Sequence, residues 1–296
     1  TGVHDLSPIA QLFMLETVRI HNTGVSDLEP LRNLTSLRWL RASETYASSI
    51  EPLSALTALE ELSIDRSPIT DISPVSALVN VTYLSIYEMA DCKPDCGSGS
   101  SAFASANKLN SLLAIGEMDK LRTLYAQDNN ISNISVLTAT KSSGDRVHQV
   151  LDHLRLDHNQ LISAAPLVGL TGLRTLGMGG NPIGTLSDIL THTMIEELYL
   201  DDTSIGTTEG IDALQFLENL DLSQNPELSG QLHDLHNLAY LEWLNLDNVG
   251  LTEVPDVSGM TSLRYLSMQN NPSLTSLTSG VQYESGGGVV PVDSPL

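Results

Sequence analysis

The chain of 296 residues is poor in aromatic residues, in basic residues and in cysteine. Phe, Trp and Tyr together make up 4% of it, so leucine and isoleucine must supply most of the packing in any core. No apolar run reaches the roughly 18 residues that a membrane-spanning helix requires, so we expect no membrane insertion. Lys and Arg number 14 against 36 Asp and Glu, a formal net charge of -22, which predicts that the chain does not bind nucleic acid or anionic lipid.

The two cysteines, Cys92 and Cys96, lie close together in the segment DCKPDCG. We expect them to close a small disulfide ring around Pro94, which would indicate an oxidising, extracellular setting. Two free thiols are the alternative. A structural zinc site needs about four ligands, and no histidine or further cysteine lies nearby, so no metal is expected at this segment.

The sequence also lacks the motifs that mark common catalytic sites. It contains no G-x-S-x-G nucleophile turn, no P-loop and no glycine-rich dinucleotide turn. His153 and Asp157 would lie roughly 13 Å apart on one strand, too far for a hydrogen bond. We therefore predict a non-enzymatic protein that uses no cofactor.

A repeated phrase, LxxLxL with conservative replacements, dominates the chain. Its alternating residues predict a short strand, and several copies carry Asn at the ninth place, where the side chain can bond to backbone groups as the chain leaves the strand. The proline-containing half of each repeat lacks helical periodicity and predicts turns or short 3-10 segments. A single repeat cannot bury its own apolar face, so the repeats should stack around one continuous core. The eleven copies begin, at a dominant spacing of 22 residues, at Leu15, Leu37, Leu59, Val81, Leu121, Leu151, Leu173, Ile195, Leu217, Leu241 and Leu263.

This repeat resembles the leucine-rich repeat family over about residues 1–277. The 22-residue period and the phrases DISP and DLEP are most similar to the internalin-type bacterial surface proteins. The resemblance implies an α/β-type repeat solenoid with a curved parallel β-sheet on its concave face and turns or 3-10 segments on its convex face. It also implies an interaction scaffold, commonly one that serves adhesion.

The repeats are interrupted, and the chain begins within one of them. Thr1 to Leu12 matches Thr23 to Leu34, the second half of a repeat, so we expect a piece of a longer protein; a second subunit that covers this end is the alternative. A gap of 40 residues predicts an insertion at about residues 89–116, which contains both cysteines, and a short amphipathic helix over residues 106–118 that returns to the solenoid. We divide the chain into a solenoid, residues 1–277, and a Gly-rich tail or linker, residues 278–296.

Side chains between the strand leucines should form columns on the concave face. Both tryptophans and most of the tyrosines fall in these columns, although the leucines already fill the core. Exposed Trp, Tyr and Arg are typical of interaction hot spots. Aromatic residues that merely cover the sheet are the alternative. The predicted partner-binding residues are Trp39, Arg41, Tyr83, Tyr87, Tyr125, His153, Arg155, Tyr199, Trp243 and Tyr265.

Charged residues are unevenly distributed in the same columns. Arg19, Arg41 and Arg155 belong to the first six copies, whereas Asp201 and Asp221 belong to later ones. Neighbouring strands lie roughly 4.8 Å apart, so Asp201 and Asp221 are a weak candidate for Ca²⁺, which needs six to eight oxygen ligands. Simple solvated carboxylates are the alternative, and no other metal site is predicted.

These observations predict an extracellular or cell-surface recognition module that binds a protein partner through its concave face, as adhesion proteins do. One alternative is a structural subunit that assembles end to end into a filament or surface layer. The other is a glycan-binding module in which Trp39, Tyr83 and Trp243 stack on sugars.

Overall fold

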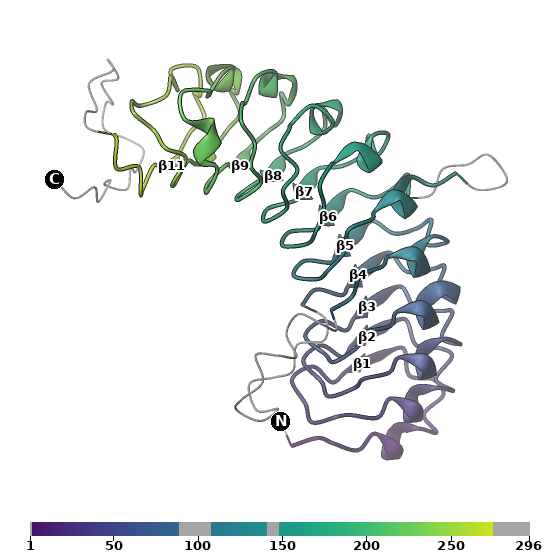
Figure 1. Ribbon diagram of the computed structural model, residues 1–296. Coiled ribbons are helices and arrows are strands. Elements are labelled where there is room, and N and C mark those ends of the chain that lie inside the picture. The colour runs from purple at the N-terminus through teal and green to yellow at the C-terminus, as the bar shows by residue number, and fades with distance from the viewer. Residues whose placement is uncertain (1, 89–107, 141–147, 275–296) are drawn as a thin grey trace. The chain divides into compact units, whose positions relative to one another are not determined.

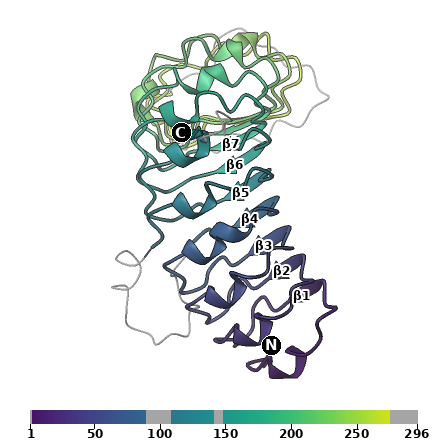
Figure 2. The same cartoon turned by 90° about the vertical axis from the view of Figure 1, so that its right-hand side faces the viewer.

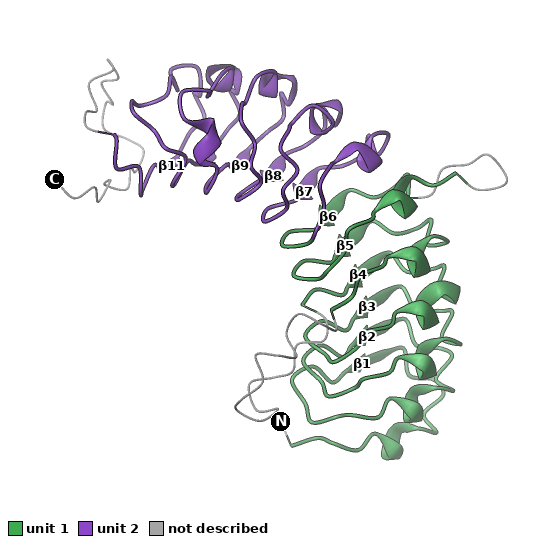
Figure 3. Ribbon diagram, viewed as in Figure 1, with its two compact units in different colours: residues 1–159 green, residues 160–296 purple. Residues whose placement is uncertain are grey.

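The computed structural model describes residues 2–88, 108–140 and 148–274, in two compact units that span residues 1–159 and 160–296 (Figure 3). Each unit is a stack of similar coils, with short strands along one side and 3-10 turns along the other (Figure 1). In the turned view, strands β1 to β6 of the first unit follow one another in chain order (Figure 2). Within each unit the strands pair in parallel, and this open sheet confirms the predicted solenoid.

Every strand has three residues and covers the third to fifth places of one LxxLxL phrase, which confirms the predicted strands. The first unit contains β1 (Thr17–Arg19), β2 (Trp39–Arg41), β3 (Glu61–Ser63), β4 (Tyr83–Ser85), β5 (Thr123–Tyr125) and β6 (His153–Arg155). The second unit contains β7 (Thr175–Gly177), β8 (Glu197–Tyr199), β9 (Asn219–Asp221), β10 (Trp243–Asn245) and β11 (Tyr265–Ser267).

The strand register is constant within each unit. Thr17 lies opposite Trp39, and Tyr83 lies opposite Thr123 even though 40 residues separate them in the chain. In the second unit, Asn219 lies opposite Trp243 across a spacing of 24 residues. Residues added between strands therefore leave equivalent places of the phrase paired, and the columns of side chains stay aligned.

The opposite side of each unit consists of 3-10 turns, as predicted. Five of the turns have proline as their second residue, whose fixed φ angle suits the first turn of a helix. Before many turns, a side-chain oxygen accepts a hydrogen bond from the backbone N–H of the residue two places later, which is the first residue of the turn. Asp71 Oδ1, for example, accepts the N–H of Ser73 at 2.7 Å. The turns of the first unit are η1 (Ser7–Ile9), η2 (Glu29–Leu31), η3 (Glu51–Leu53), η4 (Ser73–Ala77), η5 (Leu113–Ile115) and η6 (Ser135–Thr138). Those of the second are η7 (Ala165–Leu167), η8 (Ile189–Thr191), η9 (Ile211–Ala213), η10 (Pro226–Leu228) and η11 (Leu235–Asn237).

The amphipathic helix predicted over residues 106–118 is wrong for the part that the structure describes, residues 108–118. This segment contains only the turn η5. Its apolar residues Leu109, Leu112, Ile115 and Met118 are buried at intervals of three, which is the spacing of the outer half of an ordinary repeat. The apolar pattern that resembled an amphipathic helix is therefore the next coil of the solenoid.

Leucine and isoleucine side chains of successive coils form the core. Leu40, Leu62 and Leu84, the central residues of three neighbouring strands, are all 0% exposed. Burying one such side chain stabilises the fold by about 1.5–3 kcal/mol. The helical segments in the described ranges are 3-10 turns of three to five residues, none of which is long or apolar enough to cross a membrane.

Buried asparagines tie neighbouring coils together. The Nδ2 group of Asn225 donates to the carbonyl oxygens of Leu200 and Leu222 at 2.7 and 2.9 Å. Its Oδ1 atom accepts the backbone N–H of Thr203 at 2.9 Å. Asn271 makes the same kind of bonds two coils later. The predicted bonds from the ninth place to the backbone are confirmed.

One histidine occupies a leucine position in the core. His192 is 0% exposed and lies 22 residues from both Leu170 and Leu214, which are buried at the equivalent places of the adjacent coils. Its Nδ1 atom lies 3.1 Å from the carbonyl oxygen of Leu170 and so carries the proton in the neutral ring. Burial lowers the pKa of His192 from its ordinary value, although the bond to Leu170 opposes this shift.

This histidine makes stability depend on pH. The unfolded chain, with an ordinary histidine pKa of about 6.5, takes up a proton before the folded chain does. The contribution of neutral His192 is therefore complete above about pH 6.5 and is lost as the pH falls through the lowered pKa of the folded state. We expect the free energy of unfolding to fall more steeply between pH 7.5 and 5 in the natural chain than in His192→Leu. Urea denaturation across this range measures both curves, and parallel curves would contradict the prediction.

Candidate interaction surface

Side chains on the strands alternate between the core and the surface. The middle residue of a strand points inward, as the fully buried Leu40 does, whereas its neighbours Trp39 and Arg41 are half-buried and exposed. We call the surface formed by the outward residues of the strands, and by the residue two places after each strand, the sheet face. All ten residues predicted to bind a partner lie on it.

An aromatic pair lies on the sheet face of the first unit. The rings of Tyr83 and Tyr125 meet edge to face, with 5.6 Å between their centroids and an angle of 86°. Burial raises the pKa of Tyr83, so its hydroxyl stays protonated at neutral pH and can donate a hydrogen bond. Tyr87 lies two residues beyond β4 and has the guanidinium carbon of Arg66 5.5 Å from its ring centroid. All three tyrosines therefore place their rings and hydroxyls on the sheet face of the first unit.

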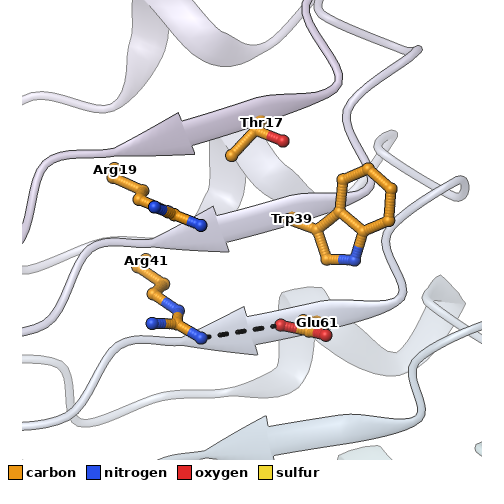
Figure 4. A pocket seen from close by; sticks show the side chains of 5 residues that line it. All are labelled: Thr17, Arg19, Trp39, Arg41 and Glu61. Atoms are coloured by element: carbon orange, nitrogen blue, oxygen red, sulfur yellow. Dashed lines mark ion pairs between the residues drawn. The ribbon is translucent and has the colours of Figure 1, made fainter.

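The first three strands form a pocket of about 290 Å³ lined by Thr17, Arg19, Trp39, Arg41 and Glu61 (Figure 4). Arg41 Nη2 lies 3.9 Å from Glu61 Oε2, too far for a hydrogen bond. Arg19 was not among the predicted binding residues. Its place one 22-residue repeat before Arg41 was the available signal, because constant register puts the two arginines opposite each other.

His153 and Arg155, also on the sheet face, are engaged by neighbouring carboxylates. His153 Nδ1 lies 2.8 Å from Asp152 Oδ1, and Arg155 Nε donates to Asp157 Oδ2 at 2.6 Å. Burial acts to raise the pKa of Asp152, but hydrogen bonds from His153 and Arg122 outweigh it and hold this pKa below its ordinary value. Asp152 is therefore a carboxylate at neutral pH, and this part of the face is stabilised internally.

A second aromatic pair lies on the sheet face of the second unit. Trp243 and Tyr265 are register partners on β10 and β11, and their rings stack at 5.4 Å with an angle of 7°. Stacked aromatic rings contribute about 0.5–1.5 kcal/mol beyond their buried area, which holds both rings in place. Tyr199 lies on β8, where its hydroxyl donates to Glu197 Oε2 at 3.3 Å.

Among the described residues, the structure adds no carboxylate or histidine ligand to the candidate calcium site at Asp201 and Asp221. Asp221 Oδ1 accepts the backbone N–H of Ser223 at 2.9 Å, and its Oδ2 accepts the amide of Asn245 at 3.2 Å. Within the described ranges there is no group of three or more His, Cys, Asp or Glu residues that could hold a metal ion. The pair of Asp201 and Asp221 stays a prediction. The predicted disulfide between Cys92 and Cys96 and the predicted Gly-rich tail at residues 278–296 lie outside the described residues.

The structure thus groups the predicted residues instead of spreading them evenly. In the first unit it brings together Tyr83 with Tyr125, and Trp39 with Arg41; in the second it brings together Trp243 with Tyr265. Sequence reasoning missed Thr17, Arg19 and Glu61 as the remaining walls of the pocket.

Comparison with known proteins supports the fold. The sequence matches no protein-family model and no curated protein significantly. Among solved structures, an internalin (inlF) of Listeria monocytogenes is 26% identical, with a TM-score of 0.69 over 83% of this chain and 65% of that one. The chain therefore spans slightly less than two thirds of that internalin. A leucine-rich repeat protein of Leptospira interrogans is 19% identical, with a TM-score of 0.68 over 90% of this chain and 70% of that one.

A further likeness is to the plant peptide hormone receptor RGFR1 in complex with RGF2, which is 17% identical, with a TM-score of 0.61 over 89% of this chain and 43% of that one. The parallel sheet, the 22-residue coils and these likenesses define a leucine-rich repeat solenoid. Within that class, the chain is similar to an internalin of Listeria monocytogenes.

Proposed function

We propose that the chain is a non-enzymatic module that binds a protein partner through its sheet face, in an extracellular or cell-surface setting. The observation that carries this proposal is the concentration of the few aromatic residues on the sheet face, although leucine side chains already fill the core. Trp39 and Trp243, the only tryptophans of the chain, both lie there outside the leucine core. Large rigid side chains on a surface are typical of interaction hot spots.

The structural likenesses support the same proposal. The internalin shares the fold at 26% identity, and one similar structure is a receptor with a bound peptide hormone. The described part of the sheet face has two pairs of aromatic rings in contact, Tyr83 with Tyr125 and Trp243 with Tyr265, and the pocket on β1 to β3. This arrangement suits a partner with several separate contact points. By analogy with the internalins, we propose adhesion as the specific role of this binding. The filament and glycan alternatives remain, and the experiment below separates them.

Alanine substitution of the tryptophans tests the proposal. We expect Trp39→Ala and Trp243→Ala each to weaken partner binding by about 2 kcal/mol, because truncation of a hot-spot aromatic removes a contact of that size. The melting temperature should fall by about a few degrees at most, since neither ring belongs to the leucine core and the stack of Trp243 on Tyr265 contributes only about 0.5–1.5 kcal/mol. The measurement is biolayer interferometry on a partner selected from an array of purified extracellular proteins, with a glycan array screened in parallel.

Two exposed aromatic residues outside the sheet face provide matched controls. Phe216 and Tyr240 are 51% and 62% exposed and precede strands β9 and β10. Phe216→Ala and Tyr240→Ala should leave partner binding unchanged. Loss of binding in these controls but not in the tryptophan variants would contradict the proposal. Binding confined to the glycan array would favour the glycan alternative, and light scattering that shows long assemblies would favour the filament.

A further inference from the structure

Two arginines line one side of the pocket on β1 to β3. Arg19 and Arg41 are register partners on adjacent parallel strands, so their backbones lie roughly 4.8 Å apart. Both side chains are exposed on the sheet face, next to each other (Figure 4). Like charges directly opposite each other destabilise a sheet. A sequence with only 14 basic residues among 296 nevertheless places two of them here.

The charges of this pair are largely unsatisfied within the described part of the chain. Every other arginine described there has a carboxylate at a hydrogen-bonded distance, for example Arg38 with Glu60 at 2.6 Å. Arg19 has no ion pair with any described residue, and Arg41 reaches only Glu61, at 3.9 Å. Their guanidinium N–H groups are therefore available as donors to a ligand.

A fixed aromatic wall stands beside the arginines. The guanidinium carbon of Arg38 lies 4.7 Å from the ring centroid of Trp39, and Glu60 holds Arg38 through two hydrogen bonds at 2.6 and 3.0 Å. A cation over one face of an indole orients the ring without covering its other face. The pocket of about 290 Å³ thus combines paired donors with a pre-positioned indole, and it is large enough for a single side chain.

We propose that this pocket binds a carboxylate group of a partner protein, with an apolar or aromatic group next to that carboxylate packing on Trp39. The inference rests on the proposed function and names the partner chemistry at one place on the sheet face. Guanidinium groups suit carboxylates because their N–H groups match the two oxygens in pairs. Two guanidiniums on adjacent strands can share one carboxylate, which also relieves their mutual repulsion.

Two features select a single carboxylate over other anions. The whole chain carries a formal charge of -22, which repels a run of acidic residues or a nucleic acid at long range. The carboxylate of Glu61 in the pocket wall disfavours a doubly charged phosphate more strongly than a singly charged carboxylate. The carboxylate can come from an acidic side chain or from a chain end, and the probes below distinguish these sources.

Small probes test the pocket without knowledge of the partner. The probes are N-acetyl-tryptophan (a chain-end carboxylate), N-acetyl-aspartyl-tryptophan amide (a side-chain carboxylate), neutral N-acetyl-tryptophan amide, and inorganic phosphate. Titrations followed by the ¹H–¹⁵N signals of the arginine Nε groups and the Trp39 indole report binding at this place. We expect the two carboxylate probes to shift these signals, the tighter of them to identify the source, and the neutral amide and phosphate to bind more weakly.

Charge-neutral substitutions supply the matched controls. Arg19→Gln and Arg41→Gln should each weaken binding of the carboxylate probes about tenfold, the loss expected for one charged hydrogen-bonding group. Arg32→Gln removes the same charge directly after η2 in the same unit, where Arg32 pairs with Glu29, and should have no effect. Glu61→Gln releases Arg41 from its acidic neighbour and should tighten binding, a gain that a purely structural role would not produce.

Three outcomes overturn the inference: the neutral amide binds as well as the carboxylates, phosphate binds at least as tightly, or Arg19→Gln and Arg41→Gln retain full binding of the carboxylate probes. The proposed function fails separately. If partner binding depends on Trp243 but the carboxylate probes do not bind, the pocket inference fails and the proposed function stands. If the probes bind but Trp39→Ala and Trp243→Ala leave every partner unaffected, the reverse holds.

Discussion

Replacement of Asn225 by alanine is expected to lower the free energy of unfolding by about 3 kcal/mol, because it leaves several buried backbone groups without a partner. The side chain is 0% exposed and serves two coils at once. A cavity without polar atoms cannot replace these bonds. Urea denaturation followed by circular dichroism gives the free energy.

The chain itself offers a graded control for this prediction. Thr23 and Thr45 stand at the ninth place of earlier coils, and each donates its hydroxyl to a carbonyl three residues back, at 2.6 and 3.0 Å. Asn225→Thr should therefore retain part of the network and lose less stability than Asn225→Ala. A loss below about 0.5 kcal/mol for the alanine variant, the level of an ordinary surface substitution, would contradict this role for Asn225.

Gly259→Ala is expected to destabilise the second unit by about 2 kcal/mol or more, because it overpacks a tight contact between coils. A Cβ atom at residue 259 would lie 1.9 Å from the backbone carbonyl oxygen of His236 in η11. A backbone oxygen cannot rotate away as a side chain can, so the two coils must separate. Differential scanning calorimetry measures the fall in melting temperature.

Gly206→Ala is the matched control for this substitution. A Cβ atom at residue 206 would meet nothing within 4 Å, and the residue is not among those with positive φ. Alanine there reduces the conformational entropy of the unfolded chain, so we expect unchanged or slightly increased stability. Equal effects of the two alanine substitutions would show that the contact at Gly259 is unimportant.

Much of the fold could be predicted from the repeat because the physics that shapes one coil is local. The phrase that begins at Leu241 places its strand at residues 243–245, and the structure has β10 there. Asn225 could be assigned to backbone hydrogen bonds from its place after a strand. The segment 108–118 was misread because leucines spaced by three resemble a helical face when the coil that they pack against is not known.

The site was harder to predict, because it depends on which side chains meet across coils. The columns correctly placed Trp39 and Arg41 on the sheet face. They did not show that Arg38, whose guanidinium covers one face of the Trp39 indole, is itself held by Glu60. They also did not show that Arg155 is paired with the buried carboxylate of Asp157, while Arg19 has no such neighbour among the residues that the structure describes. Composition alone treats these arginines as equivalent, whereas their rotamers and neighbours make them different.

Constant strand register also makes the coil a unit of evolutionary exchange. Removal of 22 residues from one strand to the next, for example residues 39–60, would bring Thr17 opposite Glu61 and keep every buried leucine inward. A deletion of another length would keep this pairing only if the segment between the strands absorbed the difference, as it does in the 24-residue spacing between Asn219 and Trp243. Duplication or deletion of whole coils can therefore lengthen, shorten or recombine the sheet face, so that new combinations of surface residues arise while the core remains intact.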